Sequence, residues 1–114
     1  MNKITLTNAF SINMIKGDVA VDFREISIEK AKELIASAEE FVCAIGHADT
    51  AAVVGDILGV DLQPNRVNVS LNYPDDLIVA QYTGPRLPEG ATTLPEGSTI
   101  KFWLVGELRD YYLM

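Results

Sequence analysis

The sequence predicts one α+β domain, a mixed β-sheet flanked by helices within the broader α/β class. Its 114 residues, 1–114, fit a single domain. Short apolar segments typical of strands occur in both halves of the chain, and two segments with helical signals lie between them. Apolar residues make up 48% and charged residues 22%, proportions typical of a globular chain with one hydrophobic core.

Strand and helix signals alternate in the N-terminal third. Residues 4–6 predict a first strand, residues 7–14 a loop with two Asn and a Ser, and residues 19–23 a second strand. Ser27 is a favourable N-cap, because its hydroxyl can accept a hydrogen bond from a free N–H of the first helical turn. We expect it to begin a helix over residues 28–38, whose apolar side chains fall on one face.

A Gly-His turn separates the two central elements. Residues 41–45 are uniformly apolar, which fits either a buried strand or the end of a helix. Residues 46–49, Gly-His-Ala-Asp, form the turn, and Asp49 is expected to cap a second helix through residue 58. Gly59 is expected to end that helix, since glycine readily adopts the left-handed conformation common there.

The C-terminal half is predicted to be rich in strands. Residues 66–71 alternate between polar and apolar, which predicts a strand with Arg66 on its polar face. Residues 77–80 are continuously apolar, as in a central strand buried on both faces. Residues 100–108 predict the last strand, with a β-bulge at Gly106.

The last two strands are separated by a predicted loop over residues 84–97, which contains three Pro and three Gly. Within it the tetrapeptide Leu-Pro-Glu-Gly at residues 87–90 recurs at residues 94–97. We interpret this recurrence as a local duplication of turn chemistry and not as a repeat architecture.

Composition excludes several classes of function. Sixteen Asp and Glu against nine Lys and Arg give a net charge of −7, which repels DNA and other long nucleic acids. A small anion can still bind, because a few Arg side chains and backbone N–H groups can hold it. No apolar run is long enough to span a bilayer, and the first residues do not show the long apolar region expected of a signal peptide. We expect a cytoplasmic protein without a membrane partner, with Cys43 as a buried thiol.

The single histidine, His47, is the most informative candidate for chemistry. One His and one Cys cannot build a zinc site alone, and no metal-binding motif is present, so we expect neither a metal nor another cofactor. An imidazole before a helix start combines a side chain that titrates near neutral pH with N–H groups that attract phosphate. The commoner alternative is a surface His in a turn.

Other polar residues have equally ordinary alternatives. Arg66 is a solvated arginine unless a ligand meets the polar face of its predicted strand. Arg86 and Glu89 form, in the simplest interpretation, an exposed ion pair worth at most about 1 kcal/mol. The Asn and Ser residues of the 7–14 segment fit plain turn chemistry.

Four segments together resemble the viral-type ring nucleases that act as type III anti-CRISPR proteins. They are residues 6–14 (Leu-Thr-Asn-Ala-Phe-Ser-Ile-Asn-Met), 44–47 (Ala-Ile-Gly-His), 64–67 (Pro-Asn-Arg-Val) and 86–90 (Arg-Leu-Pro-Glu-Gly). Their order and approximate spacing fit that family over nearly the whole chain. A helix that follows the last segment in the family is replaced here by the Pro- and Gly-rich loop.

The resemblance implies a metal-independent phosphodiesterase that binds cyclic tetra-adenylate, the second messenger of type III CRISPR systems, and cuts it to linear di-adenylates. It implies a homodimer with the ring across its two-fold axis, in a prokaryotic host cell, with a virus or another mobile element as one source of the gene. By residue match, the implied catalytic residues are His47, Glu89 and Arg86, and the implied ligand contacts are Arg66, Asn8, Ser11 and Asn13.

Two other functions stay open at the level of sequence. A binding module that sequesters the ring without cutting it would use the same pocket, and only His47 argues against it. An acidic inhibitor that mimics nucleic acid would need an acidic stripe, whereas the acidic residues of this chain are scattered.

Overall fold

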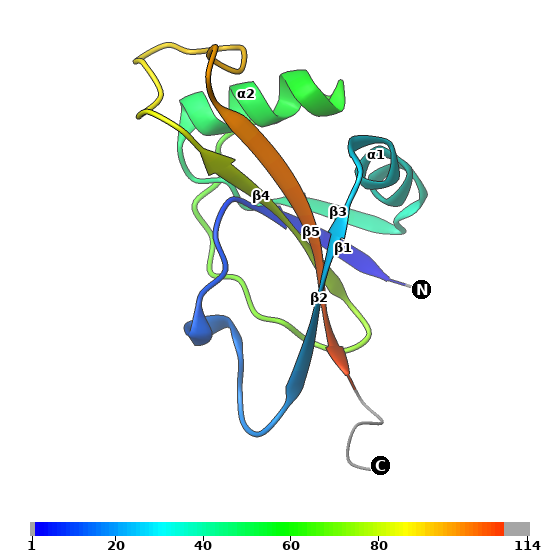
Figure 1. Cartoon of the computed structure of the whole chain (residues 1–114). Coiled ribbons are helices and arrows are strands. Elements are labelled where there is room, and N and C mark those ends of the chain that lie inside the picture. Colours follow the sequence, from blue (N-terminus) through cyan, green and yellow to red (C-terminus); the bar gives the residue numbers. More distant parts are fainter. Residues whose placement is uncertain (1, 109–114) are drawn as a thin grey trace.

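Five strands form one mixed sheet in the computed structural model, which describes residues 2–108 (Figure 1). In chain order they are β1 (Lys3–Thr7), β2 (Ala20–Ile26), β3 (Glu40–Cys43), β4 (Asp76–Thr83) and β5 (Thr99–Leu108). Across the sheet the order is β2-β5-β4-β1-β3; β1 runs parallel to β3 and β4, and β5 runs antiparallel to β4 and β2. The sheet and its helices confirm the predicted α+β class.

Both helices, α1 (Ile28–Ser37) and α2 (Ala48–Leu58), cover one face of the sheet (Figure 1). The larger core lies between them and the sheet and contains Ile4, Leu6, Ala31, Ile45, Ala51, Val54, Leu58, Leu62, Ile78, Ala80 and Phe102. Within residues 2–108, neither helix has the length and apolar character needed to cross a membrane.

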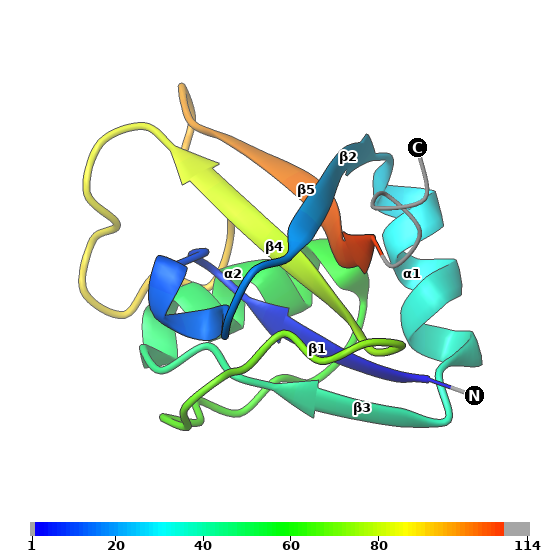
Figure 2. The same ribbon diagram turned by 90° about the horizontal axis from the view of Figure 1, so that it is seen from below.

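The opposite face of the sheet carries no α-helix and is crossed by two irregular segments, which lie nearest the viewer in Figure 2. One is residues 8–19, which include the short 3-10 helix η1 (Ile12–Met14), and the other is residues 66–75. A smaller core lies under them, with Leu71, Leu77, Val79 and Val105 at its centre.

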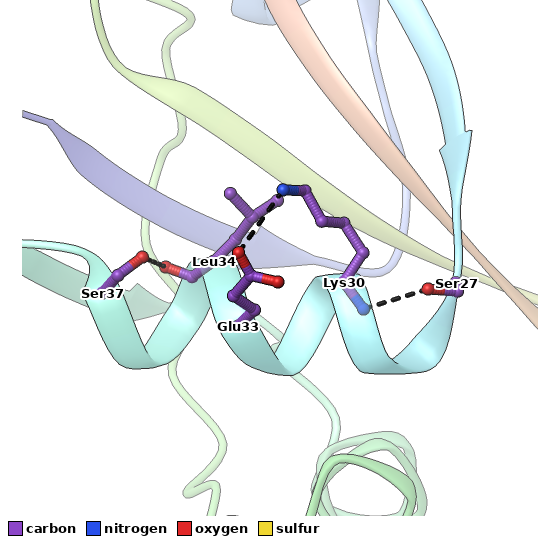
Figure 3. A network of polar contacts seen from close by, with 5 residues as sticks. All are labelled: Ser27, Lys30, Glu33, Leu34 and Ser37. Atoms are coloured by element: carbon purple, nitrogen blue, oxygen red, sulfur yellow. Dashed lines mark hydrogen bonds and ion pairs between the residues drawn. The ribbon is translucent and has the colours of Figure 1, made fainter.

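Helix α1 begins as the sequence predicts. Ser27 is its N-cap, and the Ser27 Oγ accepts a hydrogen bond from the Lys30 N–H at 3.0 Å (Figure 3). Lys30 and Glu33 form an exposed pair one turn further along, with 3.6 Å between Nζ and Oε1. The helix ends at Ser37, one residue before the predicted end, because Ala38 already has an extended backbone.

Helix α2 begins differently from the prediction, which made Asp49 its N-cap. His47 is the N-cap, and Asp49 lies inside the first turn. An acidic side chain there still interacts favourably with the positive end of the helix dipole, so the residue type fits either place. Gly59 ends the helix as predicted, in the left-handed conformation with φ of 72°.

The predicted strand over residues 66–71 is wrong, since this segment is an extended loop without ladder pairing. It runs over the helix-free face and is held at its ends: the Asn65 N–H donates to the Ile45 carbonyl at 2.8 Å, and the Leu71 N–H donates to the Met14 carbonyl at 2.8 Å. Val67 is 48% exposed, whereas Val69 and Leu71 pack in the smaller core, so the alternation marks a partly buried side without strand pairing. The segment is held in an extended conformation by contacts with other loops and not by pairing with a strand.

The predicted bulge at Gly106 is also wrong. Pairing between β2 and β5 is continuous through Gly106, which lies opposite Asp22. Glycine at position 106 lets the Asp76 side chain approach the backbone of β5 closely, because a Cβ at Gly106 would lie 2.5 Å from the Asp76 Oδ1. Both a bulge and a close contact favour glycine, and the sequence alone does not separate them.

The predicted buried strand at residues 77–80 is confirmed as part of β4. The apolar run 41–45, for which strand and helix end were both open, contributes to the partly buried strand β3, which ends at Cys43. The repeated tetrapeptide makes two equivalent turns: the Ala91 N–H donates to the Pro88 carbonyl at 3.1 Å, and the Ser98 N–H donates to the Pro95 carbonyl at 3.2 Å. Each turn has a glycine with positive φ at its third position. Cys43, expected to be a buried thiol, is only partly buried and packs against the larger core.

Candidate functional site

Three loops that follow neighbouring parallel strands meet at one edge of the sheet. Because β3, β1 and β4 run parallel, their carboxyl ends lie at the same edge, where ligands of open α/β sheets commonly bind. His47 follows β3, Asn8 follows β1, and Arg86 follows β4. The topology therefore gathers polar residues that are far apart in the sequence.

Four of the predicted site residues line one hollow of about 700 Å³: His47, Arg66, Arg86 and Glu89. Gly46, Ala48, Asp49, Pro64 and Leu87 complete its lining. The four candidate side chains come from three different loops, and Arg66 reaches the hollow from a loop and not from the strand that was predicted for it.

Two further hollows continue from the first. The second, of about 490 Å³, shares Gly46, His47 and Arg66 with the first hollow and adds Asn8. We call the three hollows together, the first, the second and the third, the polar trough.

The third hollow, of about 450 Å³, contains Ser11 and Asn13 and shares Ala44, Val67 and Asn68 with the second. Ser11 and Asn13 therefore lie along the polar trough, although they do not share a hollow with the catalytic candidates. All seven predicted site residues line this one continuous surface feature.

The N-terminus of α2 holds His47 in place. Its Nδ1 accepts a hydrogen bond from the Asp49 N–H at 3.3 Å. Since Nδ1 acts as an acceptor, the neutral ring carries its proton on Nε2, the nitrogen that remains for a ligand. The same helix start brings backbone N–H groups and the positive end of the helix dipole to the polar trough, which favours an anion.

A pair of hydrogen bonds anchors the loop that carries Arg66. The Asn65 N–H donates to the Ile45 carbonyl, and the Asn65 Nδ2 donates to the Cys43 carbonyl, each at 2.8 Å. These bonds tie the loop to the end of β3. The Arg66 Nε then donates to the Gly46 carbonyl at 3.2 Å, which leaves both Nη groups for a ligand.

Arg86 and Glu89 lie on the loop between β4 and β5. Glu89 is in the first of the two turns, which the bond from Ala91 to Pro88 closes. Both side chains are exposed, and no ion pair joins them within residues 2–108, so the simple interpretation as a surface ion pair does not hold. The Arg86 guanidinium is available to a ligand.

Ser11, an expected ligand contact, also has an ordinary role in a turn. Its Oγ accepts a hydrogen bond from the Asn13 N–H at 3.2 Å and so caps η1. The hydroxyl proton stays free to be donated, because accepting a bond uses only a lone pair. Asn8 and Asn13 expose their side chains on the same surface.

Two of the three arginines of the described chain line the polar trough. Arg66 and Arg86 line it, whereas Arg24, the other arginine of the described chain, pairs with a neighbouring aspartate on the surface. Asp49 and Glu89 add two carboxylates to the same hollow. Within residues 2–108 no three His, Cys, Asp or Glu side chains form a group that could hold a metal ion.

Sequence reasoning missed two positioning residues and one lining residue. Gly46 lets Arg66 lie across its peptide, Asn65 anchors the Arg66 loop, and Asn68 joins the second and third hollows. Gly46 and Asn65 each stand directly beside a residue that was singled out, which was the available signal. Their roles depend on contacts across about 20 positions of chain, and local spacing does not report such contacts.

Comparison with known proteins fits this architecture. The sequence model of one family, described as STIV B116-like, matches residues 4–104. The chain belongs to the STIV B116-like family. The solved structure of B116 of Sulfolobus turreted icosahedral virus matches this B116-like chain with a TM-score of 0.76 and 32% identity, over 91% of this chain and 98% of that chain.

Two viral sequences are further relatives of the B116-like chain. ORF116 of Acidianus filamentous virus 1 is 32% identical over 108 residues, which cover 94% of this chain and 90% of that protein. Protein 26 of Sulfolobus islandicus filamentous virus is 34% identical over 61 residues, which cover 54% of this chain and only 51% of that protein. These relatives are proteins of archaeal viruses, which supports the predicted viral character.

Proposed function

We propose that this B116-like protein is a metal-independent ring nuclease that binds cyclic tetra-adenylate and cuts it to linear di-adenylates. Its action would antagonise type III CRISPR signalling in the cytoplasm of a prokaryotic host. The observation that carries the proposal is the single hollow that gathers His47, Arg66, Arg86 and Glu89. An imidazole, two guanidinium groups and a carboxylate are the groups that cleavage of an RNA phosphodiester needs.

The substrate supplies its own nucleophile. The 2′-oxygen attacks the adjacent phosphorus, the bond from phosphorus to the 5′-oxygen breaks, and the products end in a 2′,3′-cyclic phosphate and a 5′-hydroxyl. The 2′-hydroxyl loses a proton and the 5′-oxygen gains one, so the step needs no further reactant. The protein must hold the attacking and leaving oxygens in line, which is a positioning task.

Charge on the phosphoryl oxygens is the second requirement. Arg66 presents its Nη groups from a fixed backbone position, and Arg86 has no partner within the described residues, so both guanidinium groups can bind phosphate. Ala48 and Asp49, at the start of α2, line the same hollow, where the positive end of the helix dipole favours an anion. These donors stabilise the transition state most if they are in place before the reaction.

His47 supplies the proton for the leaving 5′-oxygen through Nε2. The imidazolium that gives this proton carries hydrogen on both ring nitrogens, so the cap bond from the Asp49 N–H to Nδ1 opens when His47 acts as the acid. Proton transfer from a positioned group contributes about 10²–10⁴ in rate. Glu89 lines the same hollow and provides a carboxylate, which either accepts the 2′-hydroxyl proton or stabilises the imidazolium.

A homodimer completes the proposal. The ring has four equivalent linkages, and a two-fold axis through it places two copies of His47 at opposite linkages. Two cuts then yield two di-adenylates. The polar trough of each protomer would hold half of the ring.

Incubation of the protein with labelled cyclic tetra-adenylate in EDTA tests the proposal. Appearance of linear di-adenylate with a cyclic phosphate end is the expected result, and absence of turnover with or without divalent metal would refute it. The N-cap bond of His47 favours one second candidate, a sequestering protein, because it gives the imidazole a structural role that needs no catalysis. Tight binding without cleavage would establish that function instead.

A further inference from the structure

A fourth hollow, of about 400 Å³, opens on the helix-free face of the sheet beside the polar trough. Its lining is mainly aromatic and aliphatic, with two amide side chains: Asn8, Ala9, Phe10, Phe23, Val79, Gln81, Trp103 and Val105. We call it the aromatic hollow. Its chemistry differs from that of the polar trough, and no step of cleavage uses it.

The aromatic rings of this hollow are held in defined positions. Phe10 and Phe23 make an edge-to-face contact, with ring centroids 5.3 Å apart and an interplanar angle of 89°. The Trp103 indole N–H donates to the Gln81 Oε1 at 2.9 Å, which orients the indole and leaves the Gln81 NH₂ group as a free donor. The hollow is thus preformed, which lowers the entropy cost of binding a ligand.

Asn8 joins the aromatic hollow to the polar trough, because it lines both. The sheet register agrees: Thr7 pairs with Val79, and Val79 pairs with Trp103, so the three residues form one row across β1, β4 and β5. Two strand spacings separate the ends of that row, about 10 Å. Asn8 directly follows Thr7, so a ligand with its phosphate in the polar trough has the aromatic hollow within reach of its next chemical group.

We propose that the aromatic hollow binds a purine base of the ligand whose phosphate lies in the polar trough. This inference rests on the proposed function and extends it from phosphate binding to base recognition. A planar base stacks on aromatic side chains, and amide side chains such as those of Asn8 and Gln81 can pair with the N6 and N7 of adenine. An apolar hollow with two amides at its edge matches a flat base that carries polar atoms on its rim.

A second copy of the chain is the competing occupant, and the surroundings of the hollow favour a base. Segments 8–19 and 66–75 lie over part of the helix-free face (Figure 2), and the hollow beside them has a volume of about 400 Å³. Stable interfaces between proteins bury about 800 Å² per partner. One hollow with a half-exposed Phe23 at its edge offers far less.

Trp103 is the only tryptophan of the chain, so its fluorescence reports on this hollow alone. Titration of the whole protein with AMP, ribose 5-phosphate and inorganic phosphate separates base binding from phosphate binding. We expect quenching of Trp103 emission by AMP and none by the two ligands without a base. Equal responses to AMP and ribose 5-phosphate would overturn the inference, as would an emission that shifts only with protein concentration, because a second copy would then occupy the hollow.

A variant at the edge of the hollow provides the second test. Phe23→Ala is expected to weaken binding of cyclic tetra-adenylate by about 5- to 100-fold, the range for loss of one stacking ring. Binding of ribose 5-phosphate should not change. Ile12→Ala is the matched control, since Ile12 is an exposed apolar side chain that does not line the hollow. Unchanged ring affinity in Phe23→Ala would overturn the base site.

These outcomes separate the base site from the proposed function. Cleavage in EDTA by a protein whose Trp103 emission ignores AMP would leave the ring nuclease in place and remove the base site. Quenching by AMP and an effect of Phe23→Ala, without any cleavage, would keep the base site in a protein that only sequesters the ring.

Discussion

Gly46 and Arg66 lie closely against each other across the loops that follow β3 and α2. The Arg66 Nε donates to the Gly46 carbonyl at 3.2 Å, and a Cβ on Gly46 would lie only 2.8 Å from the Arg66 Cγ. A contact that short forces one side to move, and the Cγ is near the backbone, where the side chain has little freedom to yield. The absence of a side chain at Gly46 therefore sets the direction of the Arg66 guanidinium.

Gly46→Ala should reduce ligand affinity through Arg66. The expected loss approaches that of Arg66→Ala, about 1.5–3 kcal/mol for a hydrogen bond to a charged group, because the displaced guanidinium no longer reaches the phosphate. Binding of cyclic tetra-adenylate to the two single variants and the double variant measures the coupling. In an Arg66→Ala background, Gly46→Ala should add little, and additive losses would contradict the argument.

Two substitutions at His47 separate catalysis from helix capping. His47→Ala should lower single-turnover cleavage by about 10²–10⁴ and also remove the cap of α2, at a cost of about 0.5–2 kcal/mol in stability. His47→Asn should lose the same rate but keep most of the stability, because asparagine is a good N-cap without proton-transfer chemistry. Rates and thermal unfolding of both variants provide the measurement. A His47→Asn protein with wild-type rate would refute the catalytic assignment.

Arg66→Ala and Arg86→Ala should each weaken ring binding by about 1.5–3 kcal/mol with little change in folding, because each removes a charge-assisted hydrogen bond from an exposed side chain. Arg24→Ala is the matched control, since Arg24 is equally cationic but pairs with Asp22 on β2, away from the polar trough. Isothermal titration with the ring compares the three variants. Equal losses in all three would indicate a general charge effect and no defined site.

Asp76 links stability to pH at the end of the sheet opposite the polar trough. Burial raises the pKa of Asp76, and the neighbouring Asp75 carboxyl raises it further. The folded state therefore holds this proton more tightly than the unfolded chain does. The stabilisation that comes from this bound proton is complete below the ordinary carboxyl pKa of about 3.9. It is lost as pH rises through the raised pKa of Asp76.

Asp76→Asn should remove the loss of stability that the wild-type protein shows as pH rises. We expect the free energy of unfolding of the variant, relative to the wild type, to increase as pH rises from about 3 to about 7. Denaturant titrations across this range provide the measurement, and Asp56→Asn, at an exposed position of α2, controls for the removal of one negative charge. A difference that does not change with pH would show that burial of Asp76 has no energetic consequence.

The proposed dimer predicts a molecular mass in solution of twice the 12.5 kDa of one chain. Multi-angle light scattering at micromolar concentration, with and without cyclic tetra-adenylate, measures it. A monomer under both conditions would remove the ligand site from a two-fold axis. Cleavage by such a monomer would still be compatible with the polar trough, because the four side chains proposed for catalysis and binding line one hollow of a single chain.

Local chemistry explains which elements were predictable. The Ser27 cap, the Gly59 stop, the buried strand at residues 77–80 and the twin turns of the 84–97 loop each follow from a few neighbouring residues. The predictions for residues 66–71 and Gly106 failed for the opposite reason. An alternating pattern becomes a strand only beside a free strand edge, and a glycine in a strand marks either a bulge or a close neighbour.

The sequence by itself determined the α+β class, most element boundaries and the identity of the polar candidates, because propensity, capping and hydrophobic period act over a few residues. Only the tertiary structure decided that those candidates share one site. His47, Arg66 and Arg86 lie on loops far apart along the chain, and the parallel pairing of β1 with β3 and β4 brings those loops to one edge of the sheet. Strand order depends on how the whole core packs, and no local pattern carries that information.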